Sequence, residues 1–493
     1  MSRNYELGLY NEFEKLNKKI DKLLEENKNQ SLIIYSLRLE IKSLNRKLDE
    51  KDKLIEKLQN ENDKLRNGNN KNSGNSSKPP SSDTFKPNKK TGANLYNSRE
   101  KTSKSKGGQK GHIGSNLSKK KIEKLINDKK MKVIDKVHYI NTKSKKDIIK
   151  YKVGLEIIPF VERHIFKYDK SSKEVLPKEF YTDVTYDNSI KSLTMNLGAY
   201  NVISYDRLKE FYEVITKGMI TISSGTLFNF LKEFSNKSIR TLNNLENHII
   251  TSNDLNTDET TTKLDGKNMY IRNYSVEDTV LYKAHKNKGH DPIRKDNILT
   301  RFTGGIMGDH DTTLYKYGTR NYECNVHLRR YLEELVQNVH NIDWPFRMQD
   351  LLSKAYQTRE IIKRYKINNF SKEQIEYYEC LYDEMLGMAQ HQNKDIKSSF
   401  YKEKAEKLYK RLKKYKKNHL YFIKDFDVLY DNNMSERDLR FYKRKTKISG
   451  GFRNIEASEY YANALSIIKT SIKRNINPME SINAIFNNEV LFG

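Results

Sequence analysis

The stretch YDNNMSERDLRFYKRKTKISGGFR, residues 430–453, places an acid beside a run of cations, and these residue types could act together on a polyanion. If the stretch is helical, Arg440 lies one turn after Glu436 on the same face, and Lys443 and Arg444 lie about one turn further. A carboxylate can hold a divalent metal ion, and cations can hold the phosphates of a nucleic acid. The pattern therefore suits metal-assisted chemistry on a nucleic-acid backbone.

The same stretch also has a plainer interpretation. Asn433 can cap a helix with Glu436 at the third position, which is the arrangement of a capping box, and the carboxylate then only stabilises the helix start. The helix should end before Gly450 and Gly451, a pair that lets the backbone approach a phosphate closely. The candidate DNA-binding residues of the stretch are Arg437, Arg440, Lys443, Arg444, Lys447 and Arg453.

Metal-dependent phosphoryl transfer needs more than one carboxylate, converging from separate elements. Two Mg²⁺ ions about 3.5–4 Å apart activate the attacking oxygen and stabilise the leaving one. Asp258 stands at the edge of the first predicted strand and Asp309 stands where an apolar strand stops, so both are candidate partners of Glu436. Glu259 and Asp311 are weaker alternatives to Asp258 and Asp309. In the plainer interpretation each of these acids is a surface turn carboxylate.

The elements that must position these acids begin at Asn253, where the pattern changes to strands rich in β-branched and aromatic residues. The first three strands are predicted to form an antiparallel meander. The expected elements are strands at 253–259, 267–277 and 279–286, a helix at 291–301, strands at 302–307 and 321–326, and a helix at 327–336. This order predicts an α/β, RNase H-like catalytic domain over 251–342 and 421–493, interrupted by a helical insertion at 343–420.

Several stretches resemble one known family. The motif around Glu436 is similar to the signature at the last catalytic acid of the sixty-six family of insertion-sequence transposases, the TnpC type of the DDE superfamily. NSSKPPSSD at 75–83 and GGQKGHIG at 107–114 resemble the N-terminal motifs of the same family. NTDET, GDHDTTLYKYG and NNMSERDLR look like its three acidic blocks. The matches run from about Asn75 to the C-terminus.

The resemblance implies a DNA transposase that binds the terminal inverted repeats of its element and catalyses metal-dependent strand cleavage and strand transfer. Asp258, Asp309 and Glu436 would be the catalytic and metal-binding residues. They would hold two Mg²⁺ ions, for which Mn²⁺ could substitute. His327 and Arg330, in the block CNVHLRRYL, also resemble family features and would contact DNA, although a helix-capping or core role suits His327 equally well. The implied partners are the terminal repeats, target DNA and small accessory proteins of the same element.

Two other functions fit the same residues. One is a catalytically decayed relative that binds DNA and acts as a repressor, although the presence of all three carboxylates argues against decay. The other is an RNase H-like nuclease that cuts DNA without strand transfer. Inverted repeats flanking the gene would favour the transposase over both.

Residues 13–65 repeat apolar side chains at alternating spacings of three and four, which predicts a coiled coil over 1–66. Its a and d positions are Phe13, Leu16, Ile20, Leu23, Asn27, Gln30, Ile34, Leu37, Ile41, Leu44, Leu48, Lys51, Ile55, Leu58, Asn62 and Leu65. The polar members of this set cost stability but can fix register and strand number. We expect a homo-oligomer through this segment, and a helical hairpin folded back on itself is the alternative.

Two segments of low information follow. Residues 67–114 are rich in Asn, Ser, Gly, Lys and Pro, which predicts a flexible basic linker that lies along DNA or serves as a plain spacer. Residues 115–186 are predicted to form a short basic helix and a small β-rich module, with strands at 132–140, 151–160 and 162–169. The family places a cysteine-rich zinc module here, but no cysteine precedes Cys324, so we expect this degenerate region to fold without metal.

Residues 187–250 are predicted to be helical and to include a helix-turn-helix-like pair. Its helices should cover 206–216 and 224–234, with a turn at Gly218 and a cap at Ser223 or Ser224. The second helix could enter a DNA major groove, but the same pattern is common in helices that pack as core.

Composition bounds the partners and the compartment. The chain has 493 residues and a net charge of +28, which favours a polyanion such as DNA, although an AT-rich coding bias also enriches lysine. Two cysteines, Cys324 and Cys380, exclude a disulfide-rich scaffold and a four-cysteine zinc site, and they suit a reducing cytoplasm. With no membrane-spanning run and no signal peptide, we expect a cytoplasmic bacterial protein that associates with the nucleoid when it binds DNA.

Overall fold

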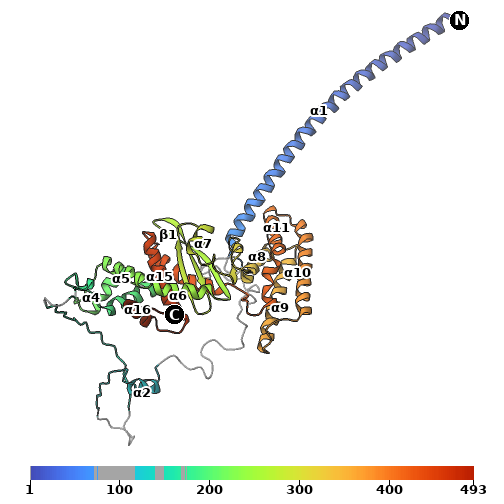
Figure 1. The fold of residues 1–493 in the computed structure, drawn as a ribbon. Coiled ribbons are helices and arrows are strands. Elements are labelled where there is room, and N and C mark those ends of the chain that lie inside the picture. Colours follow the sequence, from blue (N-terminus) through green and yellow to red (C-terminus); the bar gives the residue numbers. More distant parts are fainter. Residues whose placement is uncertain (1, 72–74, 76–116, 139–148, 168–172, 174) are drawn as a thin grey trace. The chain divides into compact units, whose positions relative to one another are not determined.

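The computed structural model describes residues 2–71, 75, 117–138, 149–167, 173 and 175–493. The chain divides into two compact units (Figure 1). The first comprises Met1–Asn88 and His327–Lys424, and the second comprises Lys89–Val326 and Asp425–Gly493. Apart from its first residues and Asn75, the predicted linker, with the NSSKPPSSD and GGQKGHIG motifs, lies outside the described residues.

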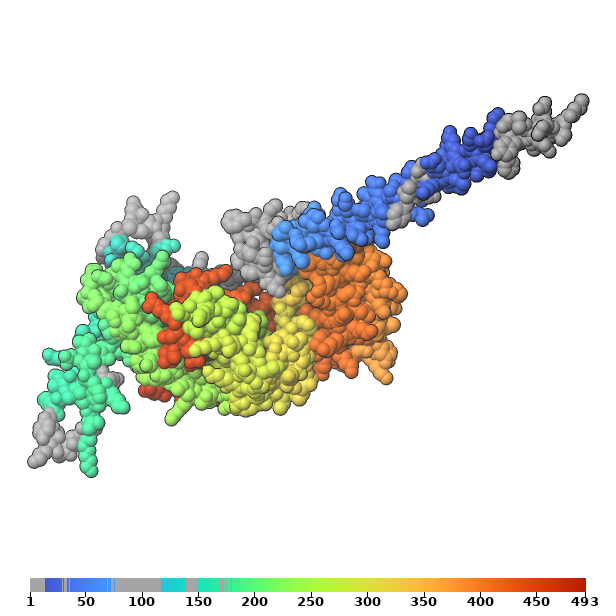
Figure 2. All heavy atoms as spheres, turned by 90° about the horizontal axis from the view of Figure 1, so that it is seen from above, coloured from blue at the N-terminus to red at the C-terminus, as the bar shows by residue number. Residues whose placement is uncertain are grey.

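Helix α1 (Ser2–Asn70) of the first unit runs without interruption for 69 residues, so the alternative of a helical hairpin is wrong. At 1.5 Å per residue it is roughly 100 Å long. Its described a and d side chains, from Leu16 to Leu65, are exposed in the single chain. Figure 2 shows the blue part of α1 extending beyond the orange helices of the same unit. No helix in the described ranges is long and apolar enough to cross a membrane.

The rest of the first unit is helical. Its helices are α8 (Asn325–Asn338), α9 (Trp344–Arg364), α10 (Lys372–Gln392), α11 (Ser399–Lys414), α12 (Lys416–His419) and α13 (Tyr421–Lys424). The fully buried Trp344 donates its ring N–H to Asn393 Oδ1 at 3.0 Å, which ties the start of α9 to the end of α10. The boundary of this unit falls at His327 rather than at the predicted residue 343, so most of α8 groups with the insertion.

The last turns of α1 contact the start of α11 through polar side chains. Asn60 Oδ1 accepts a hydrogen bond from Ser399 Oγ, and Asp63 accepts one from Ser398 Oγ. In the predicted heptad, Asn60 is an f position and Asp63 a b position, on the side opposite the a and d positions. The contact with α11 therefore leaves the apolar seam of α1 uncovered.

The second unit is built on a five-stranded mixed sheet in the order β3-β2-β1-β4-β5. The strands are β1 (Asp254–Leu264), β2 (Lys267–Ser275), β3 (Val280–His285), β4 (Gly305–Gly308) and β5 (Arg320–Glu323). β1, β2 and β3 pair antiparallel, which confirms the predicted meander, whereas β4 runs parallel to β1 and β5 parallel to β4. The five predicted strands are therefore present, with β4 and β5 shorter than expected.

The second unit also contains eight α-helices after residue 187. They are α3 (Asn188–Met195), α4 (Tyr205–Ile215), α5 (Ser224–Lys237), α6 (Ile239–Ile250), α7 (His290–Asp296), α14 (Asn433–Ser449), α15 (Ile455–Lys473) and α16 (Pro478–Phe486). Of these, α6, α14 and α15 pack on the sheet. Helix α15 closes the sheet at its edge strand, because the N–H groups of Val280 and Tyr282 donate to Thr470 Oγ1 and Ser466 Oγ at 3.1 and 2.9 Å. Helix α7 stops before the predicted residue 301, because Asn297 adopts a left-handed conformation with φ 55°.

The helix-turn-helix-like pair is present as α4 and α5, with Gly218 at φ 80° in the connection. Ser223 caps α5 by accepting a hydrogen bond from the Thr226 N–H at 3.1 Å. Leu227 of α5 is buried against α4, and Phe234 is buried in the core that includes the sheet. The core-packing interpretation of α5 is therefore confirmed, and reading of DNA by its exposed face stays a prediction.

The region 115–186 differs from expectation. Helix α2 (Lys119–Asn127) confirms the short basic helix. The described residues between 129 and 177 contain no strand, so the prediction of a β-rich module is wrong for these residues. Leu155 and Val161 are 88% and 93% exposed. Their side chains thus lack the neighbours of a sheet, and β propensity largely reflects such packing rather than a preference of the backbone itself.

Candidate active site

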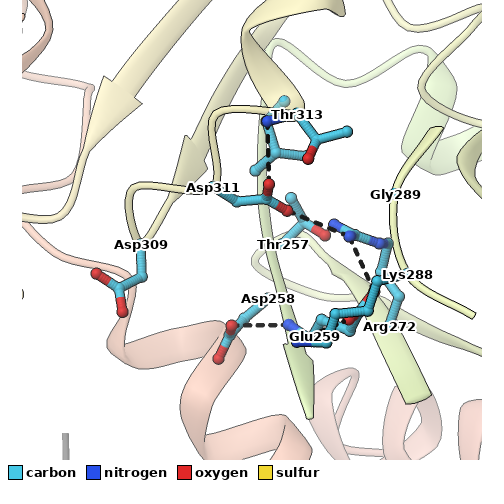
Figure 3. Close-up of a pocket in the computed structure, with 10 residues that line it drawn as sticks. Thr257, Asp258, Glu259, Arg272, Lys288, Gly289, Asp309, Asp311 and Thr313 are labelled. Atoms are coloured by element: carbon cyan, nitrogen blue, oxygen red, sulfur yellow. Dashed lines mark hydrogen bonds and ion pairs between the residues drawn. The ribbon is translucent and has the colours of Figure 1, made fainter. Parts of the chain in front are cut away.

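A cavity of about 340 Å³ lies where β4 ends while β1 continues. The two strands pair only as far as Asn256 and Met307, so the next residues of β1 border the cavity. The lining residues are Thr257, Asp258, Glu259, Arg272, Lys288, Gly289, Asp309, Asp311, Thr313 and Leu314. Figure 3 shows Asp258 and Asp309 together on one side of the ion pairs of Arg272.

Asp258 lies on β1 opposite Asn273 of β2, and its Oδ1 accepts a hydrogen bond from the Glu259 N–H at 2.7 Å. Its pKa is raised from 3.8 to about 6, chiefly by burial; the Glu259 N–H lowers it, and the negative charge of Glu436 raises it. The start of α14 therefore brings a second carboxylate, Glu436, near enough to act on Asp258 of β1. The two residues are 178 positions apart in the sequence (436 − 258).

Asp309 follows the last residue of β4 directly. The next residue, His310, has φ 43°, a left-handed conformation that is uncommon for a residue with a side chain. Its Nδ1 lies 2.6 Å from Oε1 of the buried Glu323, which also accepts a hydrogen bond from the Tyr315 hydroxyl. Strained backbone persists only where its surroundings fix it, so this cluster holds the turn that carries Asp309.

Glu436 lies on α14, but the capping box is not formed. The N-cap residue is Asn432 rather than Asn433, and its side chain makes no capping hydrogen bond in the described structure. Instead its Nδ2 donates to the Thr257 carbonyl at 3.0 Å and its Oδ1 accepts from Asn256 Nδ2 at 2.9 Å. The amide ties the helix start to β1 and shifts Glu436 one position further into the helix. The capping interpretation of Glu436 is therefore wrong.

Arg272 engages the two weaker candidate acids. Its Nη2 donates to Glu259 Oε2 at 3.0 Å and to Asp311 Oδ2 at 3.3 Å, and the residue is 2% exposed. Lys288 Nζ lies 3.3 Å from the other oxygen of Glu259. Buried charges are generally paired in this way, so the protein itself neutralises both acids. Arg272 is not among the residues predicted from the sequence, where its only signal was its place opposite Glu259 in the β1–β2 meander.

The basic residues of α14 point in different directions. All six candidate DNA-binding residues of the stretch are exposed, namely Arg437, Arg440, Lys443, Arg444, Lys447 and Arg453. Lys443 is near enough to Asp258 to lower its pKa. By contrast, Arg444 and the buried Lys469 lie over the ring of Phe441, 4.1 and 3.4 Å from its centroid. Lys443 therefore lies on the side of α14 that is near Asp258, whereas Arg444 packs on the ring of Phe441.

Helix α14 ends at Ser449, as predicted, and Gly450 follows with φ 74°. Gly451 has φ 145° and packs against β1, since a Cβ on it would lie 2.6 Å from the Lys263 carbonyl oxygen. The Phe452 N–H donates to the same oxygen at 2.8 Å. The close approach that Gly451 permits is thus made to a strand, and an approach of the glycine pair to a phosphate stays a prediction.

The remaining two DNA-binding candidates belong to the first unit. His327 is 5% exposed, and its Nε2 lies 3.2 Å from Arg330 Nη1 on the same helix. This placement agrees with the core interpretation of His327, and a phosphate contact by either residue stays a prediction.

The donor types at the cavity suit a divalent cation. Asp258 and Asp309 at the cavity, and Glu436 near enough to act on Asp258, offer the hard oxygen ligands that Mg²⁺ prefers, and a bound cation would offset the burial and the charge of Glu436 that raise the pKa of Asp258. As the side chains stand, no three His, Cys, Asp or Glu residues of the described ranges are arranged closely enough to hold an ion. The chemistry of the donors fits such an ion.

The comparison with known families decides the identity of the chain. A family model described as "Transposase IS66 family" matches residues 184–460, which is more than half of the sequence. The chain belongs to the IS66 family of transposases. The part of this IS66 family member that matches includes the five strands and all three candidate carboxylates. Residues 9–118 match a family of unknown function, DUF6444. No curated protein matches the chain.

Proposed function

We propose that this IS66 family member binds the terminal inverted repeats of its element and cuts and joins DNA strands with Asp258, Asp309 and Glu436. Its second unit is then an RNase H-like DDE catalytic domain. The observation that carries the proposal is that Asp258 and Asp309 line one cavity while the charge of Glu436 acts on Asp258. The mixed sheet, with three antiparallel strands followed by two parallel ones, supports the proposed fold.

The residues divide the work in this proposal. A divalent cation, when bound, supplies the Lewis acid that polarises the scissile phosphate and activates the attacking oxygen. The three carboxylates hold the cation, and they must be ionised to do so. Lys443, near Asp258, and Arg440, on the same face of α14, neutralise phosphates of the bound strand. Arg272 keeps Glu259 and Asp311 in ion pairs and so out of the metal site.

The proposed partners are the terminal repeats, target DNA and a second copy of the chain, joined through α1. The heptad pattern of α1 and the exposure of its described a and d side chains support the homo-oligomer. Two DNA ends must be brought together for transposition, and a dimer supplies two catalytic units.

The test of the catalytic assignment uses Asp258→Ala, Asp309→Ala and Glu436→Gln in cleavage and strand-transfer assays with repeat-end DNA. Each variant should lose activity by on the order of 10³-fold or more, because a displaced cation forfeits several kcal/mol of transition-state stabilisation. DNA binding should be retained, because these carboxylates hold metal rather than DNA. Mg²⁺ or Mn²⁺ should support turnover, and Ca²⁺ should support binding with little turnover.

Glu456→Gln is the matched control, because Glu456 is an exposed acid in the first turn of the neighbouring helix α15. It should leave activity near that of the parent. Full strand transfer by Glu436→Gln on a pre-cleaved end would remove Glu436 from the site. Cleavage without any joining in the parent protein would favour the nuclease over the transposase.

A further inference from the structure

Asn273 is a fully buried amide on β2, and both polar atoms of its side chain bond to elements that carry the candidate acids. Its Oδ1 accepts hydrogen bonds from the Asp258 N–H at 3.1 Å and from Ser435 Oγ at 2.7 Å. Its Nδ2 donates to the Ser435 carbonyl and to Ser275 Oγ, each at 3.0 Å. One side chain therefore binds the backbone of a candidate ligand and the residue directly before Glu436.

Asn432 makes a second link of the same kind between α14 and β1, through its hydrogen bonds to Thr257 and Asn256. We refer to Asn273 and Asn432 together as the amide clasp. Both are fully buried, and Ser435, which bonds to Asn273, is buried as well. The clasp thus joins β1, β2 and the first turn of α14 by hydrogen bonds that are buried away from solvent.

A buried amide is expensive to desolvate unless it is fully bonded, whereas apolar side chains could pack α14 on the sheet without that requirement. Apolar contacts are non-directional and would tolerate small shifts or rotations of the helix. Three hydrogen bonds of Asn273, two with Ser435 and one from the Asp258 N–H, are directional, so they fix where the first turn of α14 lies relative to Asp258. The separation of Asp258 and Glu436 depends on that placement.

We propose that Asn273 is a positioning residue that sets the separation of Asp258 and Glu436 and thereby the affinity of the site for a divalent cation. The inference rests on the proposed function, since it assumes that these two carboxylates share an ion. Asn273 is not one of the residues that line the cavity, so it acts through Asp258 and Glu436 rather than on DNA. Residues that orient metal ligands in this way typically change metal affinity by about 10–100-fold when they are removed.

The experiment measures Mn²⁺ binding to the full chain by calorimetry, without DNA and without turnover. Asn273→Ala should weaken Mn²⁺ binding by about 10–100-fold. Ser435→Ala removes one of the hydrogen bonds of Asn273 and should weaken binding by a smaller factor. The control is Ser466→Ala, because Ser466 is equally buried and hydrogen-bonded but anchors α15 to β3. It should lower the melting temperature while leaving Mn²⁺ affinity within about twofold.

A second measurement separates positioning from general damage. The Mg²⁺ concentration for half-maximal cleavage should rise in Asn273→Ala and Ser435→Ala, and saturating Mg²⁺ should restore part of the rate. Parent-like Mn²⁺ affinity in both variants would overturn the role of Asn273. If Asn273→Ala does not fold, Ser435→Ala decides the question alone. If Glu436→Gln binds Mn²⁺ as the parent does, or the parent binds none, the proposed function itself fails and this inference fails with it.

Discussion

Asp258 and Asp311 line the same cavity, yet the protein treats their charges in opposite ways. Burial raises the pKa of Asp258 to about 6, with Glu436 adding to the effect. Burial also acts to raise the pKa of Asp311, but hydrogen bonds from Thr313 and the charge of Arg272 outweigh it, and the pKa is lowered. Ionised Asp258 therefore destabilises the folded state, whereas ionised Asp311 stabilises it. A carboxylate kept ionised against its surroundings is typical of functional sites.

We expect Asp258→Asn to stabilise the metal-free protein at pH 8. The folded state binds the proton of Asp258 more tightly than the unfolded state does, so the ionised group costs folding stability above pH 6 and that cost fades as the pH falls toward 4. A pKa rise from 3.8 to about 6 corresponds to about 3 kcal/mol. Urea unfolding in EDTA should therefore show a gain of about 2–3 kcal/mol at pH 8 and little gain near pH 4.

Asp311→Asn is the control of opposite sign. Its carboxylate accepts hydrogen bonds from Arg272 and the Thr313 N–H, so its removal should destabilise the fold at pH 8. A gain in stability from both variants would mean that the two acids do not differ as their surroundings indicate.

At the scale of elements, two helices that both carry regularly spaced apolar residues use them differently. Helix α1 presents its apolar a and d positions to solvent in the single chain and contacts α11 by the opposite side. Helix α5 buries Leu227 and Phe234 in the second unit, where Phe234 packs edge-on against Phe486. Removal of the residues before Asn253 would therefore open the core of the second unit, so α5 must be probed by substitutions on its exposed face.

The coiled coil is tested by Leu44→Glu, which places a charge at a d position of α1. The parent should be at least a dimer at micromolar concentration by light scattering, and the variant should shift toward monomer because a buried carboxylate at the seam has no partner. Ser43→Glu introduces the same charge one residue away, at a c position outside the seam, and should keep the parent mass. A monomeric parent would rule the coiled coil out.

At the scale of the whole molecule, the formal charge of +28 and the basic face of α14 predict binding to DNA that depends strongly on salt. The charge is not confined to the site, since Lys and Arg together number 92 along the chain. Much of the affinity for DNA should therefore be independent of the DNA sequence. The basic face of α14 should add contacts near the scissile phosphate.

Arg440→Gln tests that contribution. The slope of log affinity against log salt concentration should become shallower by about 0.9 for the loss of one phosphate contact. The control is Arg46→Gln on the exposed surface of α1, which should change the slope little if α14 carries the contact. Equal changes in both variants, measured by fluorescence anisotropy with a repeat-end duplex, would assign Arg440 to the diffuse charge of the chain.

The sequence by itself determined the features that depend on local pattern. The spacing of apolar residues predicted one long helix, the alternation of residue types predicted the β1–β2–β3 meander, and Gly450 marked the end of α14. The family motifs likewise pointed to the transposase family. These signals are readable because helix period, strand alternation and left-handed glycine act over a few neighbouring residues.

Only the tertiary structure decided the features that depend on distant partners. The local pattern predicted a cap at Asn433, but the helix begins after Asn432, whose amide bonds to Thr257, 175 positions away. The only signal for Arg272 was its place opposite Glu259 in the meander, because Asp311, its other acidic partner, lies 39 positions further along the chain. A polar side chain bonds to whichever buried group the fold brings within reach. Its role is therefore fixed by packing rather than by the residues beside it.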